Sequence, residues 1–207
     1  MFKQQFSSIQ NYVLFATSGL ILWFFFSNLT NQSVGSIVGS AGLVRSLNIP
    51  VEFFPLSEML SELFNLMLTL VVFMTVMHWF GMVYSLRLLF IVPCVILFAL
   101  FAFGLNLFLC SVNVFFRDIG IIWNTIQPAM FYLTPIAYPE SMIAPQYKLI
   151  IKCNPIYYFI KLGRGILYET QAPSWHLWLE CIIIAGTMYI VGQFVFNRLK
   201  NQFISAI

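Results

Sequence analysis

The residues most able to do chemistry are two adjacent charges, Arg117 and Asp118, which stand between two long apolar runs. Neither charge belongs at the centre of a bilayer, where each would cost about 2.5–3.5 kcal/mol on insertion scales. The pair therefore predicts a place where the chain reaches a membrane surface and turns back. The next apolar run contains Pro128 and Pro135, which remove backbone donors and predict a kinked or broken span. Lipid tolerates such a span only where protein or a water-filled cavity covers the freed backbone groups, so this segment is predicted to line a path.

The sequence contains none of the common catalytic or metal-binding motifs. H-E-x-x-H, G-x-x-x-x-G-K-[ST] and G-x-S-x-G are absent, and no nucleophile, base or metal cluster stands out. The four cysteines have no close-pair spacing, and Cys94, Cys110 and Cys181 lie in apolar runs, as small hydrophobic side chains do. We therefore expect no catalytic residue, no cofactor and no metal in this chain, and it is not predicted to be an enzyme.

Composition places the whole chain in a membrane. Of its 207 residues, 60% are hydrophobic and 8% are charged, against about 25% charged in soluble domains. The formal net charge of +3 is small and dispersed, which argues against a nucleic-acid partner. The apolar runs are too long and too uniform for a membrane barrel, whose strands alternate over about ten residues. Isolated spans of this length satisfy their own backbone only as helices, so the fold class is an all-α integral membrane protein.

Hydrophobicity divides the single membrane domain, 1–207, into about five transmembrane helices. The predicted spans are 12–29, 59–80, 88–112, 119–138 and 177–196. The fourth has twenty residues, which as a helix reach about 30 Å, one hydrocarbon thickness. Glu58 and Glu62 resemble a helix start, with acids near the positive end of the helix dipole, so we place no acidic residue in mid-span.

Two stretches do not fit a span. Segment 30–58 is polar, and the spacing of its apolar residues predicts one short amphipathic helix, which is either a surface helix or a docking element for a soluble partner. Segment 139–170 carries four of the ten basic residues, and its apolar pieces are too short to cross a bilayer. Pro155 separates two half-length helices there. This pattern predicts a re-entrant helical hairpin near the C-terminal end, with a hairpin lying on the membrane surface as the alternative.

Charge counting gives no firm orientation. Five spans place the termini on opposite sides, and a cytoplasmic C-terminal tail leaves four basic residues inside and six outside. The positive-inside rule therefore leans weakly the other way. Four of the six outer charges belong to the hairpin, where positive charge can serve an anionic substrate.

Several motifs together resemble one family. F-F-R-D-I-G at 115–120, Q-P-A-M-F-Y-L-T-P-I-A-Y-P at 127–139 and N-P-I-Y-Y-F-I-K-L-G-R-G-I-L-Y at 154–168 are similar to ABC-2 type permeases that export polysaccharides such as O-antigen, capsule or teichoic acid. L-V-R-S-L-N-I-P at 43–50 is similar to the same family, and the likeness covers nearly the whole chain. Family members begin with an interface helix and one further span, so this chain resembles a member shortened at its N-terminus.

The resemblance implies a role for each unusual stretch. Segment 30–58 would be cytoplasmic and carry the coupling helix that docks on the ATPase, with Leu43, Arg45, Leu47 and Pro50 as coupling residues. Arg117 and Asp118 would lie at the cytoplasmic mouth. The hairpin 139–170 would form the gate on the other side. The implied channel and gate residues are Tyr132, Pro135, Tyr138, Pro139, Asn154, Pro155, Tyr157, Tyr158 and Arg164.

The function implied is that of a multi-pass inner-membrane permease subunit, which exports a lipid-linked polysaccharide. Two copies of this chain would enclose the channel, and two copies of a separate ABC ATPase subunit would bind ATP and drive export. One alternative is an ABC-2 type exporter of a drug or a lipid. A second is an ion-coupled secondary carrier, but that class needs intramembrane acids and often an inverted repeat, and the sequence suggests neither.

Overall fold

The computed structural model describes residues 12–46, 49–79, 86–169 and 173–203, and every regular element within these ranges is helical. The long helices are α2 (Tyr12–Val34), α5 (Phe53–Trp79), α6 (Ile91–Phe115), α7 (Asp118–Leu133) and α10 (Trp175–Leu199). The shorter α-helices are α3 (Ser36–Gly39), α4 (Ala41–Ser46), α8 (Lys148–Lys152) and α9 (Pro155–Leu167). Single 3-10 turns are η1 (Leu86–Phe90), η2 (Glu140–Met142), η3 (Pro145–Tyr147) and η4 (Lys200–Gln202).

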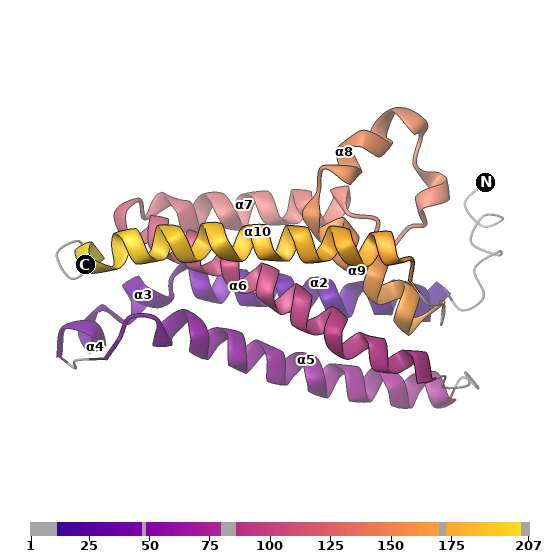
Figure 1. Ribbon diagram of the computed structural model, residues 1–207, viewed down its shortest axis with the longest axis horizontal. Helices are drawn as coiled ribbons and strands as arrows, with labels where there is room; N and C mark the ends of the chain where they lie inside the picture. Colours follow the sequence, from indigo (N-terminus) through magenta and orange to yellow (C-terminus); the bar gives the residue numbers. More distant parts are fainter. Residues whose placement is uncertain (1–11, 47–48, 80–85, 170–172, 204–207) are drawn as a thin grey trace.

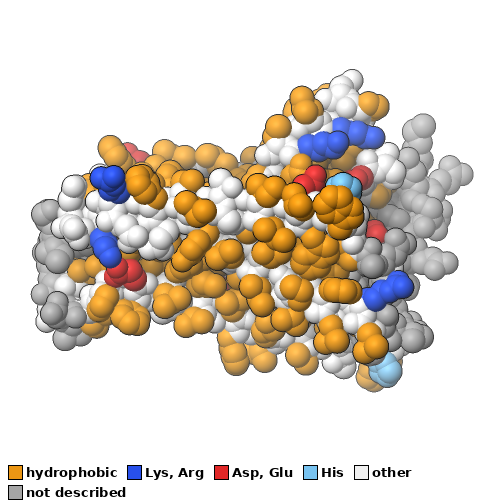
Figure 2. Space-filling view, in the orientation of Figure 1, with side chains coloured by type: hydrophobic (Ala, Val, Ile, Leu, Met, Phe, Trp, Pro, Cys, Tyr) orange, Lys and Arg blue, Asp and Glu red, His pale blue; other side chains and the backbone are white. Residues whose placement is uncertain are grey.

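Four helices of the described chain are long and apolar enough to cross a membrane. They are Tyr12–Val34, Phe53–Trp79, Leu86–Phe115 and Trp175–Gln202, and they correspond to four of the five predicted spans. Hydrophobic side chains cover the middle of the visible face in Figure 2, whereas charged side chains gather towards its two ends. This distribution is the one expected of a protein whose middle lies in lipid.

The remaining predicted span, 119–138, which is the fourth in chain order, is a shorter helix. Helix α7 has 16 residues, so it reaches about 24 Å against a hydrocarbon thickness of about 30 Å. Pro128 lies inside this helix, and the break falls before Pro135. Thr134 is extended, with φ −95° and ψ 129°, because the ring of the following proline disfavours the helical region for the residue before it. The count of five crossings stays a prediction.

The prediction that Glu62 stands at a helix start is wrong. Helix α5 begins at Phe53, nine residues earlier, which places Glu62 about 13 Å along the helix axis. Pro55 lies in the first turn, where a missing backbone donor leaves no hydrogen bond unmade, so the helix extends back past the acidic pair. Glu62 is therefore an acid inside a candidate span, and its side chain is buried.

Helix α9 is held in the bundle by a cluster of phenylalanine rings. Phe159 stacks on Phe98 and Phe101 of α6, with ring centroids 5.0 and 5.1 Å apart. Phe26 of α2 stacks on the same two rings at 6.1 and 6.2 Å. All four rings are buried, and pairs in such geometry add about 0.5–1.5 kcal/mol each beyond their buried area. These aromatic residues therefore pack helices together and do not line a path.

Helices α6 and α10 cross at two glycines. A Cβ atom added to Gly104 would lie 2.5 Å from the Cα of Tyr189, and one added to Gly192 would overlap the backbone of Gly104. The absence of side chains lets the two backbones touch, as small residues do at helix crossings in membranes. This contact joins the last span to the centre of the bundle.

The loops gather at the two ends of the bundle (Figure 1). We call one the α9 end; it holds α8, α9 and the loop 134–154. We call the other the α4 end; it holds α3, α4, the start of α7 and the end of α10. Segment 30–58 contains two short helices, α3 and α4, where the sequence predicted one, and α8 stands away from the bundle while α9 lies within it.

Candidate functional site

The site at the α9 end begins with Asn154, which starts α9. Its Oδ1 accepts a hydrogen bond from the backbone N–H of Ile156 at 3.0 Å, and Pro155 occupies the first helical turn. Both residue types favour a helix start, because the side chain satisfies a free donor and the proline has none to satisfy. The Nδ2 of Asn154 also donates to the hydroxyl of Thr134 at 2.8 Å. One side chain therefore starts α9 and ties it to the end of α7.

Arg164 makes the second tie between α9 and the segment after α7. Its Nη1 donates to the carbonyl oxygen of Pro135 at 2.9 Å, and its Nη2 donates to the carbonyl of Ile136. The guanidinium carbon lies 3.9 Å from the ring centre of Phe15 on α2, a cation–π contact. Arg164 is only 7% exposed. The charge thus satisfies backbone carbonyls at a place where the chain is not helical and needs donors.

Gly19 makes room for this guanidinium. A Cβ atom added there would lie 2.5 Å from Nη2 of Arg164 and 3.2 Å from the carbonyl oxygen of Ile136. Any other residue at this position of α2 would push against the ion and the loop it holds. Helix α2 therefore contributes an open space and, one turn earlier, the ring of Phe15.

A polar cluster stands beside Arg164 on the same helix. Lys161 Nζ lies 3.0 Å from a carboxylate oxygen of Glu140 and donates to the hydroxyl of Tyr157 at 2.8 Å. Tyr157 in turn donates to Glu140. Burial alone would raise the pKa of Glu140, but the hydrogen bonds from Tyr157 and Lys161 outweigh it and hold that pKa below its usual value. The carboxylate is therefore kept charged.

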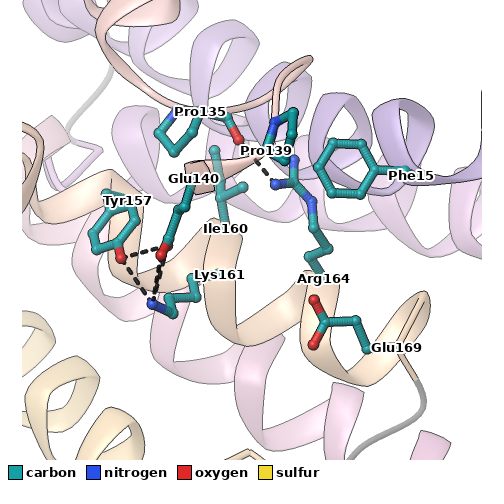
Figure 3. A pocket seen from close by; sticks show the side chains of 9 residues that line it. All are labelled: Phe15, Pro135, Pro139, Glu140, Tyr157, Ile160, Lys161, Arg164 and Glu169. Atoms are coloured by element: carbon teal, nitrogen blue, oxygen red, sulfur yellow. Dashed lines mark hydrogen bonds and ion pairs between the residues drawn. The ribbon is translucent and has the colours of Figure 1, made fainter. Parts of the chain in front are cut away.

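These groups line one cavity of about 210 Å³ (Figure 3). Its lining residues are Phe15, Pro135, Pro139, Glu140, Tyr157, Ile160, Lys161, Arg164 and Glu169. The cavity presents two carboxylates, from Glu140 and Glu169, two cationic side chains, from Lys161 and Arg164, and the ring of Phe15. Such an arrangement suits the binding of polar groups. No group of three metal-ligating side chains occurs in the part of the chain that the structure describes.

A second cavity, of about 360 Å³, lies beside the end of α7 and is rich in tyrosine. Tyr132, Tyr138 and Tyr147 line it, and the hydroxyl of Tyr138 donates to the carbonyl of Tyr132 at 2.8 Å. The ring of Tyr132 is largely exposed. Tyr158 lines neither of these two cavities, and its hydroxyl donates to the carbonyl of Lys152 at 3.0 Å. Six of the nine predicted gate residues therefore line one of these two cavities, whereas Asn154, Pro155 and Tyr158 line neither.

The predicted coupling residues and mouth residues lie at the α4 end. Leu43 on α4 and Pro50 just before α5 are exposed, as are Arg117 and Asp118 at the start of α7. Arg45 lies on α4, and Leu47 falls outside the described residues. Lys200 and Glu52 also lie at this end and form an ion pair at 2.9 Å. The structure thus separates the coupling and mouth residues from the gate residues by the length of the bundle.

Sequence reasoning missed seven residues of the site, namely Phe15, Gly19, Thr134, Glu140, Ile160, Lys161 and Glu169. Tyr157 and Lys161 are spaced i, i+4 on one helix, a spacing at which side chains meet, so this pair was open to prediction. Glu140 directly follows the proline-rich motif, but Glu169 is nearer to that pair in sequence, so spacing alone did not single out Glu140. Phe15 and Gly19 carried no signal, because their partner lies more than 140 residues away in sequence.

Proteins of known family resemble this chain along most of its length. A family model described as ABC-2 type transporter matches residues 1–168. The O-antigen export system permease protein RfbA of Klebsiella pneumoniae is 30% identical over 94% of this chain and 75% of its own length. RfbA of Myxococcus xanthus is 24% identical over 97% of this chain and 78% of its own length. The capsule polysaccharide export inner-membrane protein CtrC of Neisseria meningitidis is 24% identical over 93% and 75%. The chain belongs to the ABC-2 type transporter family.

Proposed function

We propose that this chain is the permease subunit of an ABC exporter that carries a lipid-linked polysaccharide across the inner membrane. The similar proteins are named for export of O-antigen and of capsule polysaccharide, and they match almost the whole chain. The structural observation that carries the proposal is the half-length helix α9. Arg164 and Asn154 hold it inside the bundle at the end opposite to the exposed helix α4.

In this proposal α7 is a fifth crossing, and α8 with α9 forms a re-entrant gate. Helix α9 has 13 residues, about 20 Å, which is too short to cross a bilayer alone. The non-helical residues 134–139 would be costly in bare lipid, because their backbone groups need partners. Arg164 supplies two of these partners from α9 itself. The tyrosine cavity and the charged cavity would then face the exported glycan.

The energy would come from a separate ATPase subunit, which docks on the α4 end. Exposed Leu43 and Pro50 suit such a contact, because burying apolar surface favours protein–protein association. Two permease copies and two ATPase copies would form the complete exporter. The permease would contribute no catalytic group and no cofactor.

Complementation tests the proposal. The full chain, supplied with its ATPase subunit, is expressed in a strain that makes lipid-linked glycan but lacks its own permease. We expect surface glycan to be restored, as measured on whole cells by a glycan-specific antibody. Intracellular glycan that stays unexported, together with active efflux of a drug or a lipid, would support the other branch of the family instead.

The coupling surface has a test of its own. We expect Leu43→Ala and Arg45→Ala to lower export while the ATPase keeps hydrolysing ATP, because the contact that transmits its motion is weakened. Leu86→Ala is the matched control, since this leucine of η1 is 86% exposed and lies outside the proposed gate. Export at the wild-type level in both α4 variants would show that the ATPase docks elsewhere.

A further inference from the structure

A groove of about 420 Å³ runs between α2 and α5, within the candidate spans. Its polar lining consists of Thr17 and Asn28 from α2 and of Glu62, Asn65 and Thr69 from α5. On α5 these residues follow the spacing i, i+3, i+7, which places them on one face of the helix. Other positions of α5 present exposed apolar side chains, among them Phe64, Leu68 and Val71. Helix α5 therefore has a polar face towards the groove and an apolar surface for lipid.

Glu62 is the most unusual group in this groove. It is 4% exposed and lies about 13 Å along α5. Gln32 donates to its Oε1 at 2.8 Å, and Asn65 donates to the same oxygen at 3.3 Å. Oε2 has no hydrogen-bond partner within the part of the chain that the structure describes, and no cation pairs with the carboxylate there. Acidic groups inside spans are costly, and they mark substrate or ion pathways.

The groups around Glu62 fit a polyhydroxylated ligand. A carboxylate accepts hydrogen bonds from hydroxyl groups, whereas amides and threonine hydroxyls both donate and accept. The side chain of Asn28 makes no hydrogen bond within the described chain, and Asn65 uses only its Nδ2 group there. Both amides can therefore still bond to a ligand in this groove. Phe24, 55% exposed, borders the same groove and offers a flat apolar face. Calcium takes six to eight oxygen ligands, whereas the five polar residues of this lining are spread along two helices.

We propose that the α2–α5 groove is a glycan contact site inside the membrane, in which Glu62 accepts hydrogen bonds from sugar hydroxyl groups. This inference rests on the proposed function, because it assumes that the cargo is a glycan. It adds a site between the mouth at the α4 end and the cavities at the α9 end. A glycan crossing the bundle would then meet hydrogen-bonding groups at mid-depth.

Photo-crosslinking during export tests contact directly. A benzophenone amino acid replaces Asn65 in the groove, and in a second variant it replaces Leu68 on the lipid side, where the side chain is 52% exposed. In cells that hold the ATPase and radiolabelled glycan, we expect a crosslinked glycan at position 65 at least tenfold above that at position 68. We also expect this product to vanish with an inactive ATPase. Equal labelling at both positions, or none at position 65 while glycan still reaches the surface, would overturn the inference.

Glu62→Gln and Glu62→Leu separate charge from shape. Glutamine keeps a hydrogen-bonding side chain of the same size, so we expect export to fall about fivefold to tenfold, and more than tenfold with leucine, because one or two charged hydrogen bonds to the cargo are lost. Thr75→Val is the control, since Thr75 is exposed and its hydroxyl bonds only to the carbonyl of Val71 in the described chain. Membrane level and melting temperature are measured for each variant, and the crosslinking result holds even if leucine impairs folding.

The outcomes separate the two proposals. If the wild-type chain exports no glycan, the proposed function fails and the glycan site fails with it. If the wild type exports glycan and Glu62→Gln exports equally well, only the groove site is wrong. Wild-type export that requires Na⁺, with the requirement lost in Glu62→Gln, would assign the groove to a cation and overturn the glycan site.

Discussion

At the α9 end of the bundle, the loop after α7 is held from within by a buried ion, whereas at the α4 end the terminus of α10 is held by an aromatic ring and a surface ion pair. Arg164 reaches two backbone carbonyls of that loop and is almost fully covered by protein. At the α4 end, Phe203 packs on Phe196 and Phe115 with ring centroids 5.6 and 6.1 Å apart, and Lys200 meets Glu52 at the surface. The first arrangement fixes irregular backbone, and the second fixes only the end of a helix.

The difference follows from what each end must do in a membrane. Irregular backbone near lipid has to find hydrogen-bond partners in the protein, and a buried guanidinium can supply several donors in a fixed geometry. The α4 end reaches water, where backbone groups can bond to solvent. Under the proposed function, the leucine and proline side chains exposed there are free to contact the ATPase subunit. The following changes test this contrast, from the largest expected effect to the smallest.

Replacing Arg164 should have the largest effect. Arg164→Met leaves the carbonyls of Pro135 and Ile136 without donors, and each unmade bond to a charged group costs about 1.5–3 kcal/mol. We expect the free energy of unfolding to fall by about 3–5 kcal/mol, read from melting in detergent or nanodiscs.

Arg164→Lys is the informative comparison for that change. Lysine keeps the charge but lacks the planar fork that meets two carbonyls at once, so we expect it to recover less than half of the loss. A methionine variant as stable as the wild type would mean that the loop after α7 is held by its own turn and not by α9.

Phe203→Ala should weaken the α4 end, and by less. Its ring is fully buried against Phe196, and removing such a ring from a core costs about 3–5 kcal/mol. Because η4 is a single short 3-10 turn, local unfolding there can relieve part of this cost, and we expect about 2–3 kcal/mol. Limited proteolysis should then cut after α10 sooner than in the wild type. Unchanged cleavage would show that Lys200 and Glu52 hold this end without the ring.

Gly19→Ala tests the space beside Arg164. The new methyl group would meet Nη2 at 2.5 Å, so the guanidinium must shift, and overpacking of this kind costs about 1–3 kcal/mol. Gly186→Ala on α10 is the matched control, because nothing lies within 4 Å of a Cβ atom there. We expect the control to melt at or slightly above the wild-type temperature. Equal melting of the two variants would show that the guanidinium yields without loss.

Helix existence could be read from the sequence because long apolar runs leave few alternatives. The four longest helices follow the predicted spans, and the break at Pro135 follows from proline geometry alone. Helix ends were harder. The start of α5 was placed too late because Glu58 and Glu62 resemble a cap, whereas Pro55 in the first turn allows the helix to begin earlier.

The site was predictable only where its residues are close in sequence. Asn154 and Pro155 are residue types typical of a helix start, and they occupy the first positions of α9. The partners of Arg164 could not be predicted from local patterns. Gly19 matters because it has no side chain, and Phe15 resembles any aromatic residue of a core. Glu62 was hidden for the same reason, since its bond to Gln32 depends on how α2 and α5 pack.

Lowering the pH should have the smallest effect on stability, and the effect should be nearly the same at the α9 end and the α4 end. Glu140 and Glu52 both have pKa values held below the usual value, because hydrogen bonds and nearby lysines outweigh the effect of burial. Their bonds therefore stabilise the fold fully above the ordinary pKa of 4.5, and this contribution is lost as the pH falls through the lowered values. Both ion pairs are more than a third exposed, so each contributes less than about 1 kcal/mol.

Between pH 6 and pH 3 we expect the melting temperature of Glu140→Gln, and equally that of Glu52→Gln, to fall slightly less than that of the wild type. A large difference between the two variants would mean that Glu140, tied through Tyr157 to the neighbourhood of Arg164, helps to hold the buried ion in place.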